Sequence, residues 1–261
     1  MLWLILLSFL RLSSWYNTQM EKLFSIAISN GLTAPAIRVE SRKDLSNAMN
    51  ELDFHSPRPV LVILGGAGKM SEADLTRLRS FFVKVLAPLV EELGASVVDG
   101  GTDFGVMQMI GQARAEISAT FSLIGVIPVG KVALSGQIPP ESTALEPHHS
   151  HFVLIPGSNW GDESPWLADV ATLVAKDTPS VAVLVNGGEI SQKDVSESLK
   201  ANRPVLAVAG SGRLADTLTA ALRGETTDEG VRELVASGLV QAIDFKESFD
   251  DLTELIKSYL S

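Results

Sequence analysis

Short runs of apolar residues recur along this chain, and most of them do not alternate with polar residues. Six runs rich in valine and isoleucine cover residues 60–64, 96–98, 122–127, 152–155, 181–185 and 205–209. Strands that are buried on both faces have this pattern, whereas strands with one face in water alternate apolar and polar side chains. The runs therefore predict a mostly parallel sheet with helices on both faces.

Stretches with helical periodicity separate these runs. They cover residues 72–93, 106–119, 165–175, 193–200 and 215–221, and further helices are expected at 44–52 and 251–260. Strands that alternate with helices indicate β–α–β units with right-handed crossovers. We therefore predict an α/β, Rossmann-like, doubly wound fold. Residues 24–29 and 36–39 could add a first layer or a hairpin, and residues 240–243 could form a last strand.

The first ten residues, MLWLILLSFL, stand apart from this pattern. The run is shorter than the roughly 20 residues that span a bilayer, and no basic residue precedes it as in a signal peptide. We expect residues 1–19 to be a non-structural extension, or the result of a start assigned upstream of Met20. A weak membrane anchor is the alternative. The remaining residues, 20–261, are expected to form a single domain.

Composition and charge narrow the classes of function. The chain has 21 Lys and Arg against 31 Asp and Glu, a net charge of −10, whereas a nucleic-acid binder needs a basic face. It has no cysteine, which excludes disulfides, zinc–thiolate sites, iron–sulfur clusters and thiol catalysis. We expect a cytoplasmic protein that binds neither nucleic acid nor a membrane. A small anionic ligand remains compatible with this charge, because backbone amides at helix N-termini can hold one.

Glycine-rich turns follow five of the predicted strands. Glycine lets a ligand approach the backbone, and a helix that starts after such a turn offers unpaired N–H groups. Because the carboxyl ends of parallel strands share one edge, the turns predict a crevice for phosphate or a nucleotide. The ligand-binding candidates in these turns are Gly65, Gly66, Ala67, Gly68, Lys69, Gly100, Gly101, Thr102, Asp103, Gly105, Pro156, Gly157, Ser158, Asn159, Gly187, Gly188, Gly210, Ser211, Gly212 and Arg213.

Charged side chains beside these turns could contribute chemistry. The guanidinium of Arg213 could bind phosphate through two hydrogen bonds, or it could form a surface ion pair. Asp103 and Glu163 could accept hydrogen bonds from ribose or act as a general base on water. Asp103 could instead cap its helix. They are the two candidate catalytic residues.

Histidines and tryptophans lie close to the same turns. His151 could donate a hydrogen bond to phosphate or ribose. Trp160 and Trp166 could stack on a base, or they could belong to the core or to a lid. Histidines also occupy positions 148 and 149, but no third type of metal ligand accompanies them, so we predict no metal site.

The order of these motifs resembles the SLOG superfamily. The motifs are VLVILGG at 60–66, DGGTDFGVM at 99–107, HSHFVL at 149–154, VNGG at 185–188 and GSGRLAD at 210–216. Within this superfamily, the chain is most similar to the LSDAT group, the prokaryotic relatives of the N-terminal homology region of TRP-melastatin channels. The resemblance extends from about residue 36 past Arg213.

This resemblance implies a Rossmann-like fold that binds nucleotide-derived ligands. In the channel relatives the region can bind ADP-ribose, and a Gly-Ser-Gly-Arg turn contacts phosphate, which implies that role for Gly210–Arg213. Those relatives also carry a basic residue on the helix after the turn that corresponds to residues 156–161, whereas residues 165–175 have none. Bacterial relatives are associated with nucleotide signalling and defence.

More distant SLOG members are the LOG phosphoribohydrolases, whose Pro-Gly-Gly-x-Gly-Thr-x-x-Glu loop carries a catalytic glutamate. In this chain Pro156 and Gly157 begin in the same way, but residues 158–163 differ in type and spacing.

Three functions are therefore considered. The first is a sensor that binds a nucleotide derivative, such as ADP-ribose or an NAD-related molecule. The motifs assign no cofactor to it. The second is a hydrolase of an N-glycosidic or phosphate bond, with Glu163 or Asp103 in the reaction. The third is an interaction module with a vestigial crevice, whose acidic C-terminal helix binds a partner. A homo-oligomer or an effector partner is compatible with each.

Overall fold

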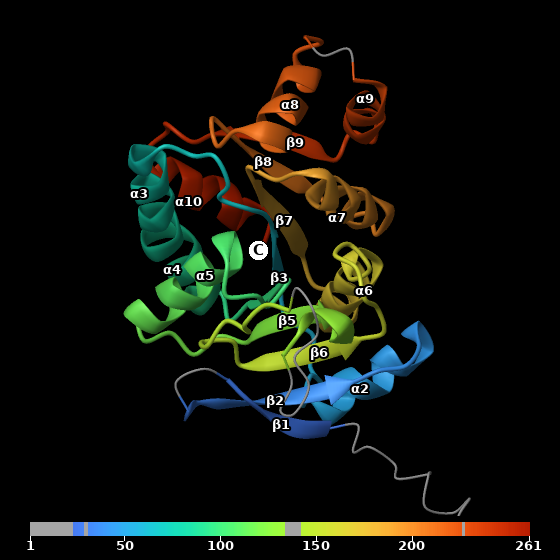
Figure 1. The fold of residues 1–261 in the computed structure, drawn as a ribbon. Helices are drawn as coiled ribbons and strands as arrows, with labels where there is room; N and C mark the ends of the chain where they lie inside the picture. Colours follow the sequence, from blue (N-terminus) through green and yellow to red (C-terminus); the bar gives the residue numbers. More distant parts are fainter. Residues whose placement is uncertain (1–22, 29–30, 134–141, 226–227) are drawn as a thin grey trace, which may run out of the picture.

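The computed structural model describes residues 23–28, 31–133, 142–225 and 228–261. Within these ranges nine strands form one sheet (Figure 1). The strands are β1 (Leu23–Ala27), β2 (Thr33–Arg38), β3 (Val60–Gly65), β4 (Ser96–Asp99), β5 (Leu123–Pro128), β6 (His151–Ile155), β7 (Ser180–Val185), β8 (Val205–Ala209) and β9 (Val240–Asp244).

The sheet has the order β1-β2-β6-β5-β4-β3-β7-β8-β9. Strand β1 pairs antiparallel with β2, as one of the two early arrangements predicted, and every other neighbouring pair is parallel. From β3 the chain first adds β4, β5 and β6 outward on one side. It then returns to pair β7 with the other side of β3 and continues outward through β8 and β9.

Helices cover both faces of the sheet (Figure 1). One face carries α2 (Leu45–Glu51), α6 (Ser164–Ala175), α7 (Glu189–Lys200), α8 (Arg213–Leu222) and α9 (Glu229–Ala236), and the other carries α3 (Glu72–Phe81), α4 (Ala87–Glu92), α5 (Gly105–Glu116) and α10 (Phe249–Ser258). Successive β3 side chains enter opposite cores: Val62 and Leu64 pack under α6 and α7, while Leu61 and Ile63 pack under α3 and α5. Burial on both faces explains why the strand runs do not alternate, and the predicted Rossmann-like fold is confirmed.

The predicted helix over residues 72–93 has one irregular turn. Helices α3 and α4 are joined without a break by a π-helical turn at Phe82–Leu86. Pro88 follows as the second residue of α4, and its missing N–H removes a donor from the normal helical ladder. The wider turn is therefore placed where the sequence cannot supply a regular α-helical hydrogen bond.

Two parts of the prediction need comment. Residues 1–19 lie outside the described residues, so the expectations for them stay predictions. Helix α9 was not anticipated, because it follows α8 closely and has only one fully buried residue, Val231. In the part of the chain that the structure describes, no helix is long and apolar enough to cross a membrane.

Candidate functional site

The candidate site is a pocket at the centre of the sheet edge. The chain builds the sheet outward from β3 through β4 on one side and later from β3 through β7 on the other. The strand order therefore reverses at β3 and β7, and the carboxyl ends of these strands border a crevice, the place where open α/β sheets bind ligands. A pocket of about 760 Å³ lies there, within the size range of small-molecule sites. Eight candidates from the sequence line it: Gly65, Gly66, Gly100, Thr102, Glu163, Gly187, Gly188 and Arg213.

The turn after β3 requires glycine. Gly65 has φ of +116°, and a Cβ atom at this position would lie 1.9 Å from the carbonyl oxygen of Val185 at the end of β7. The Gly66 amide donates to that same oxygen over 3.0 Å. Any side chain at position 65 would therefore push β3 and β7 apart, and glycine keeps the floor of the pocket closed.

Arg213 reaches across the pocket edge from α8 to α7. A Cβ atom on Gly188 would lie only 2.5 Å from its Nη2 atom, so the guanidinium rests directly on the Gly188 backbone. Gly188 is the residue before the first turn of α7, where amides lack helical acceptors. Among the residues that the structure describes, the Arg213 guanidinium has no hydrogen-bond or ion-pair partner. It is a cation available to an anion in the pocket.

The predicted turn after β8 holds Arg213 in place. The hydroxyl of Ser211 accepts a hydrogen bond from the Asn186 amide and donates to the Val208 carbonyl. The Asn186 side chain donates to the Ser211 carbonyl over 2.7 Å. The polar groups of Ser211 are therefore used to join the turns after β7 and β8, which fixes the start of α8 beside α7.

One wall of the pocket is apolar. Phe104, immediately before α5, is 68% exposed, and Ile190 on the first turn of α7 is 38% exposed. Trp160 lies in the same lining, and the Lys131 ammonium is 5.7 Å from its ring centroid. Large apolar side chains left exposed at a cavity suit the flat face of an aromatic ligand group. The sequence had singled out Trp160 but not Phe104 or Ile190.

A second wall carries two buried carboxyl groups. Glu163, directly before α6, accepts a hydrogen bond from the Gly161 amide over 2.8 Å, and burial raises its pKa. Asp194 on α7 is 9% exposed, and burial, with the nearby Glu163 carboxyl, raises its pKa to about 7. Asp194 was missed because it sits in an ordinary amphipathic helix, with no motif around it.

Several predicted turns use their amides within the protein. In the turn after β6, the Asp162 carboxylate accepts from the amides of Ser158 and Asn159, both over 3.0 Å. In the turn after β8, the Asp216 carboxylate accepts from the Gly210 amide over 2.6 Å. The candidates that do not line the pocket are Ala67, Gly68, Lys69, Gly101, Asp103, Gly105, His151, Pro156, Gly157, Ser158, Asn159, Gly210, Ser211 and Gly212.

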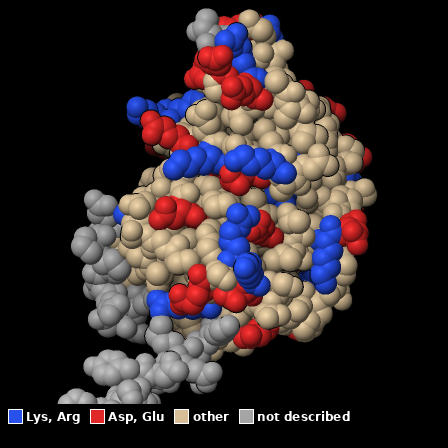
Figure 2. Space-filling model, turned by 90° about the vertical axis from the view of Figure 1, so that its right-hand side faces the viewer, with Lys and Arg blue, Asp and Glu red and all other residues tan. Residues whose placement is uncertain are grey.

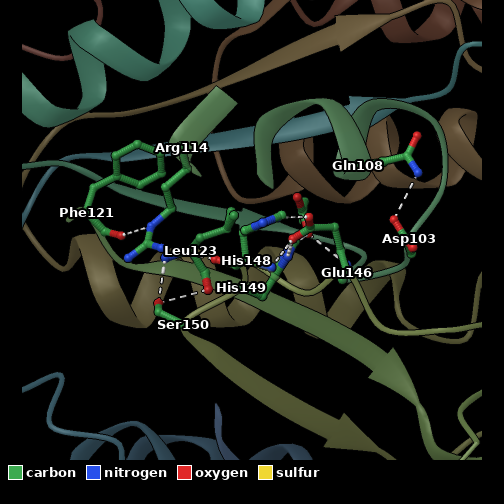
Figure 3. Close-up of polar contacts among 11 residues, drawn as sticks. Asp103, Gln108, Arg114, Phe121, Leu123, Glu146, His148, His149 and Ser150 are labelled. Carbon is green, nitrogen blue, oxygen red and sulfur yellow. Dashed lines mark hydrogen bonds and ion pairs between the residues drawn. The ribbon is translucent and has the colours of Figure 1, made fainter. Parts of the chain in front are cut away.

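The side chains of His151 and Asp103 lie outside the pocket. His151 is the first residue of β6, so it lies at the amino end of the strand, opposite the pocket edge. Its ring packs edge-on against Phe54 with centroids 4.9 Å apart, and burial lowers its pKa to about 4. The Asp103 carboxylate accepts from the Gln108 side chain over 3.0 Å and makes no capping bond to α5 (Figure 3).

A buried set of side chains, which we call the histidine network, supports the loop after β4 that borders the pocket. It consists of Asp99 and of Glu146, His148 and His149, the three that are labelled in Figure 3. His149 contacts Asp99 Oδ1 through Nε2 and Glu146 Oε2 through Nδ1, both at 2.8 Å. Burial lowers the pKa of His149, but the two carboxylates outweigh it and raise that pKa to about 9. The ring is therefore a cation at neutral pH.

The network fixes the backbone that borders the pocket. The Asp99 carboxylate accepts the Gly101 amide over 2.7 Å, and the Glu146 amide donates to the Gly101 carbonyl over 3.0 Å. Thr102 pairs with Leu145 in a short antiparallel bridge beside these bonds. Within the described ranges, no His, Asp and Glu side chains converge as metal ligands. The histidines instead attach residues 142–149 to the loop after β4.

The face that carries α2, α6 and α7 bears charges of both signs (Figure 2). Arg42 pairs with Asp169, and Lys200 pairs with Glu197 over 2.6 Å. Basic and acidic side chains lie beside each other on this face and do not form separate basic and acidic patches. The expectation that the chain does not bind nucleic acid stays a prediction.

The fold and the pocket define a Rossmann-like α/β domain with a cavity at the reversal point of its sheet. The chain belongs to the SLOG domains described as "SLOG in TRPM, prokaryote", whose family model matches residues 58–253. The resemblance inferred from the glycine motifs is thereby confirmed.

Curated relatives are ion channels that are much longer than this chain. Transient receptor potential cation channel subfamily M member 2 of Mus musculus is 25% identical over 237 residues, which cover 76% of this chain. The subfamily M member-like 2 channel of Nematostella vectensis is 24% identical over 71% of the chain, and human member 7 is 26% identical over 70%. The chain spans 15%, 15% and 11% of these channels.

Proposed function

We propose that this chain binds an anionic, nucleotide-derived small molecule in the pocket between β3 and β7. Its phosphate lies against Arg213, at the start of α7 and beside the Gly65–Gly66 turn. The observation that carries this proposal is the guanidinium of Arg213, which rests on Gly188 inside the pocket and has no partner among the described residues. A cation and the N-terminus of a helix together favour an anion.

The other walls favour a nucleotide over a simple anion. The pocket volume of about 760 Å³ greatly exceeds the size of a phosphate ion. Phe104, Trp160 and Ile190 supply an apolar surface for a base. ADP-ribose and related NAD-derived molecules combine these groups, and the family relationship to the channel domains favours them as ligands. The chain would then act as a cytoplasmic sensor.

A thermal-shift screen of the full chain tests this function. The probes are ADP-ribose, NAD, cyclic ADP-ribose, AMP and cyclic dinucleotides. A ligand at 100 times its Kd should raise the free energy of unfolding by about 2.7 kcal/mol. Arg213→Ala should lower the affinity for the binding probe about tenfold or more, because hydrogen bonds to a charged group are worth about 1.5–3 kcal/mol. Arg223→Ala, at the exposed end of the same helix, should keep the wild-type affinity.

Chromatography of the recovered probe separates binding from turnover. Intact ligand supports a sensor. A cleaved ligand would favour a nucleotide hydrolase, for which the buried carboxyl groups of Glu163 and Asp194 are the observation to follow. If no probe shifts the melting temperature, the proposed ligand class is wrong, and an interaction module becomes the better interpretation.

A further inference from the structure

Asp194 lies on the same face of α7 as the phosphate position. Residues 188, 191 and 194 are three apart, so they follow one side of the helix, and all three line the pocket. Six residues at about 1.5 Å each place Asp194 about 9 Å along the helix from Gly188. This separation corresponds to a phosphate and an attached sugar, and exceeds the reach of phosphate alone.

The Asp194 carboxyl is buried, and one of its two oxygens lacks a partner in the part of the protein that the structure describes. The residue is 9% exposed, the Ser164 side chain acts on its carboxyl through a hydrogen bond, and its Oδ1 atom has no partner among the described residues. Buried polar atoms in proteins are almost always paired, so an unpaired atom in a pocket wall requires an explanation. A ligand that donates a hydrogen bond to Oδ1 supplies one.

The charged groups around Asp194 determine which kind of hydrogen-bond donor a ligand can place there. Burial is the main cause that raises the pKa of Asp194, and the nearby Glu163 carboxyl raises it further. A hydrogen bond with Ser164 and the charge of Lys193 act in the opposite direction. Two neighbouring carboxyl groups repel phosphate and accept hydrogen bonds readily. A ligand cation is disfavoured, because the raised pKa of Asp194 leaves its carboxyl only partly ionised near pH 7. Neutral hydroxyl groups match this wall best.

We propose that Asp194, with Glu163 beside it, forms a second subsite that binds the hydroxyl groups of a sugar in the ligand. This inference rests on the proposed phosphate position at Arg213 and gives the bound molecule a direction. Its phosphate lies at the start of α7, and its sugar lies six residues, less than two turns, further along that helix. Asp194 is then a specificity-determining residue that distinguishes a hydroxylated sugar from a deoxy sugar.

Titration calorimetry with AMP and 2′,3′-dideoxy-AMP tests the subsite, because the two nucleotides differ only in the sugar hydroxyls. Wild-type protein should bind AMP about tenfold or more tightly, since hydrogen bonds to a carboxyl are lost with the analogue. Asp194→Leu, which removes both oxygens and keeps a similar volume, should bind both nucleotides equally. Asp177→Asn, on an exposed turn, should keep the wild-type preference.

Two results overturn the subsite alone: equal affinity of the wild-type protein for both nucleotides, or a full preference for AMP in Asp194→Leu. The wild-type comparison needs no variant, so it holds even if Asp194→Leu does not fold. If Arg213→Ala still lowers the affinity in either case, the phosphate site stands without the sugar subsite. Failure of both nucleotides to bind would overturn the subsite together with the phosphate site.

Discussion

The histidine network and the pocket both bury charged groups near the carboxyl edge of the sheet. The two regions differ in whether these groups have hydrogen-bond partners within the protein. In the histidine network, both nitrogens of His149 and both oxygens of Glu146 have partners at 2.7–2.8 Å, and only Asp99 Oδ2 has none among the described residues. In the pocket, Asp194 Oδ1 has no partner among the described residues, and the Arg213 guanidinium has none either. The comparison suggests that paired charges hold the site in shape, while the unpaired charges that line the pocket remain for a ligand.

This difference has an energetic basis. Removing one partner of a buried charge pair leaves the other charge desolvated and alone, which costs about 3–5 kcal/mol. Removing a buried charge that has no partner also removes its desolvation penalty, so stability changes little or increases. Substitutions in the two regions should therefore change the free energy of unfolding in opposite directions.

The largest effect is expected at His149. His149→Ala leaves the carboxylates of Asp99 and Glu146 buried without their shared cation, and should lower the free energy of unfolding by about 3–5 kcal/mol at pH 7. Urea denaturation measures this value. His55→Ala, at a side chain that is 62% exposed, is the matched control and should stay within about 0.5 kcal/mol of wild type. A loss below about 1 kcal/mol at His149 would contradict a charged network.

The pH dependence of His149 gives a further check on that variant. The pKa of His149 is raised in the folded protein, to about 9 from an ordinary 6.5. Its contribution to stability is therefore complete below about pH 6.5 and is lost as the pH rises through about 9. The difference between wild type and His149→Ala should shrink over this range, so equal differences at pH 6 and pH 9.5 would show that the ring is not charged.

The next largest effect is expected at Asp194, with the opposite sign. Its pKa is raised to about 7 from an ordinary 3.8, so the unfolded chain ionises first and the folded state loses stability as the pH rises from about 4 to about 7. Each pKa unit is worth about 1.4 kcal/mol. Asp194→Asn does not titrate and should be more stable than wild type at pH 8 by a few kcal/mol.

Urea denaturation of Asp194→Asn at pH 4 and pH 8 measures this gain. It should be small at pH 4, where Asp194 is protonated in the folded protein. Glu163→Gln should behave similarly with a smaller gain, since burial also raises the pKa of Glu163. Asp177→Asn should show neither effect. A loss of stability in Asp194→Asn at pH 8 would mean that the carboxylate has a structural partner.

The sequence predicts the fold better than it predicts the site. The runs at 60–64 and 181–185 follow from burial on both faces, a local property that side-chain type reveals. The pocket depends on distant pairs: His149 meets Asp99 across 50 positions, and no local pattern marks that contact. Turns with similar glycines also differ in use, because Asp162 occupies the amides of Ser158 and Asn159, whereas at the start of α7 the Gly188 amide donates to the Ser191 hydroxyl over 3.3 Å.

The smallest effect, and the sharpest test of the comparison, is expected at Gly188. Its φ of −133° suits any residue, so Gly188→Ala adds no backbone strain. The new Cβ atom would lie 2.5 Å from Arg213 Nη2, at the flexible end of a side chain that can move away. Stability should stay within about 1 kcal/mol of wild type. Affinity for the nucleotide should fall severalfold, because the guanidinium leaves the phosphate position.

A double-mutant cycle isolates this mechanism. If Gly188→Ala acts through Arg213, it should have no further effect on calorimetric affinity in an Arg213→Ala background. Gly230→Ala on α9 is the control, since its Cβ atom would approach Gln192 and Asp228 at no less than 3.3 Å, outside the pocket. Additive losses from the two pocket variants would show that the helix start binds the ligand independently of Arg213. The guanidinium would then not be the group that the pocket keeps unpaired for phosphate.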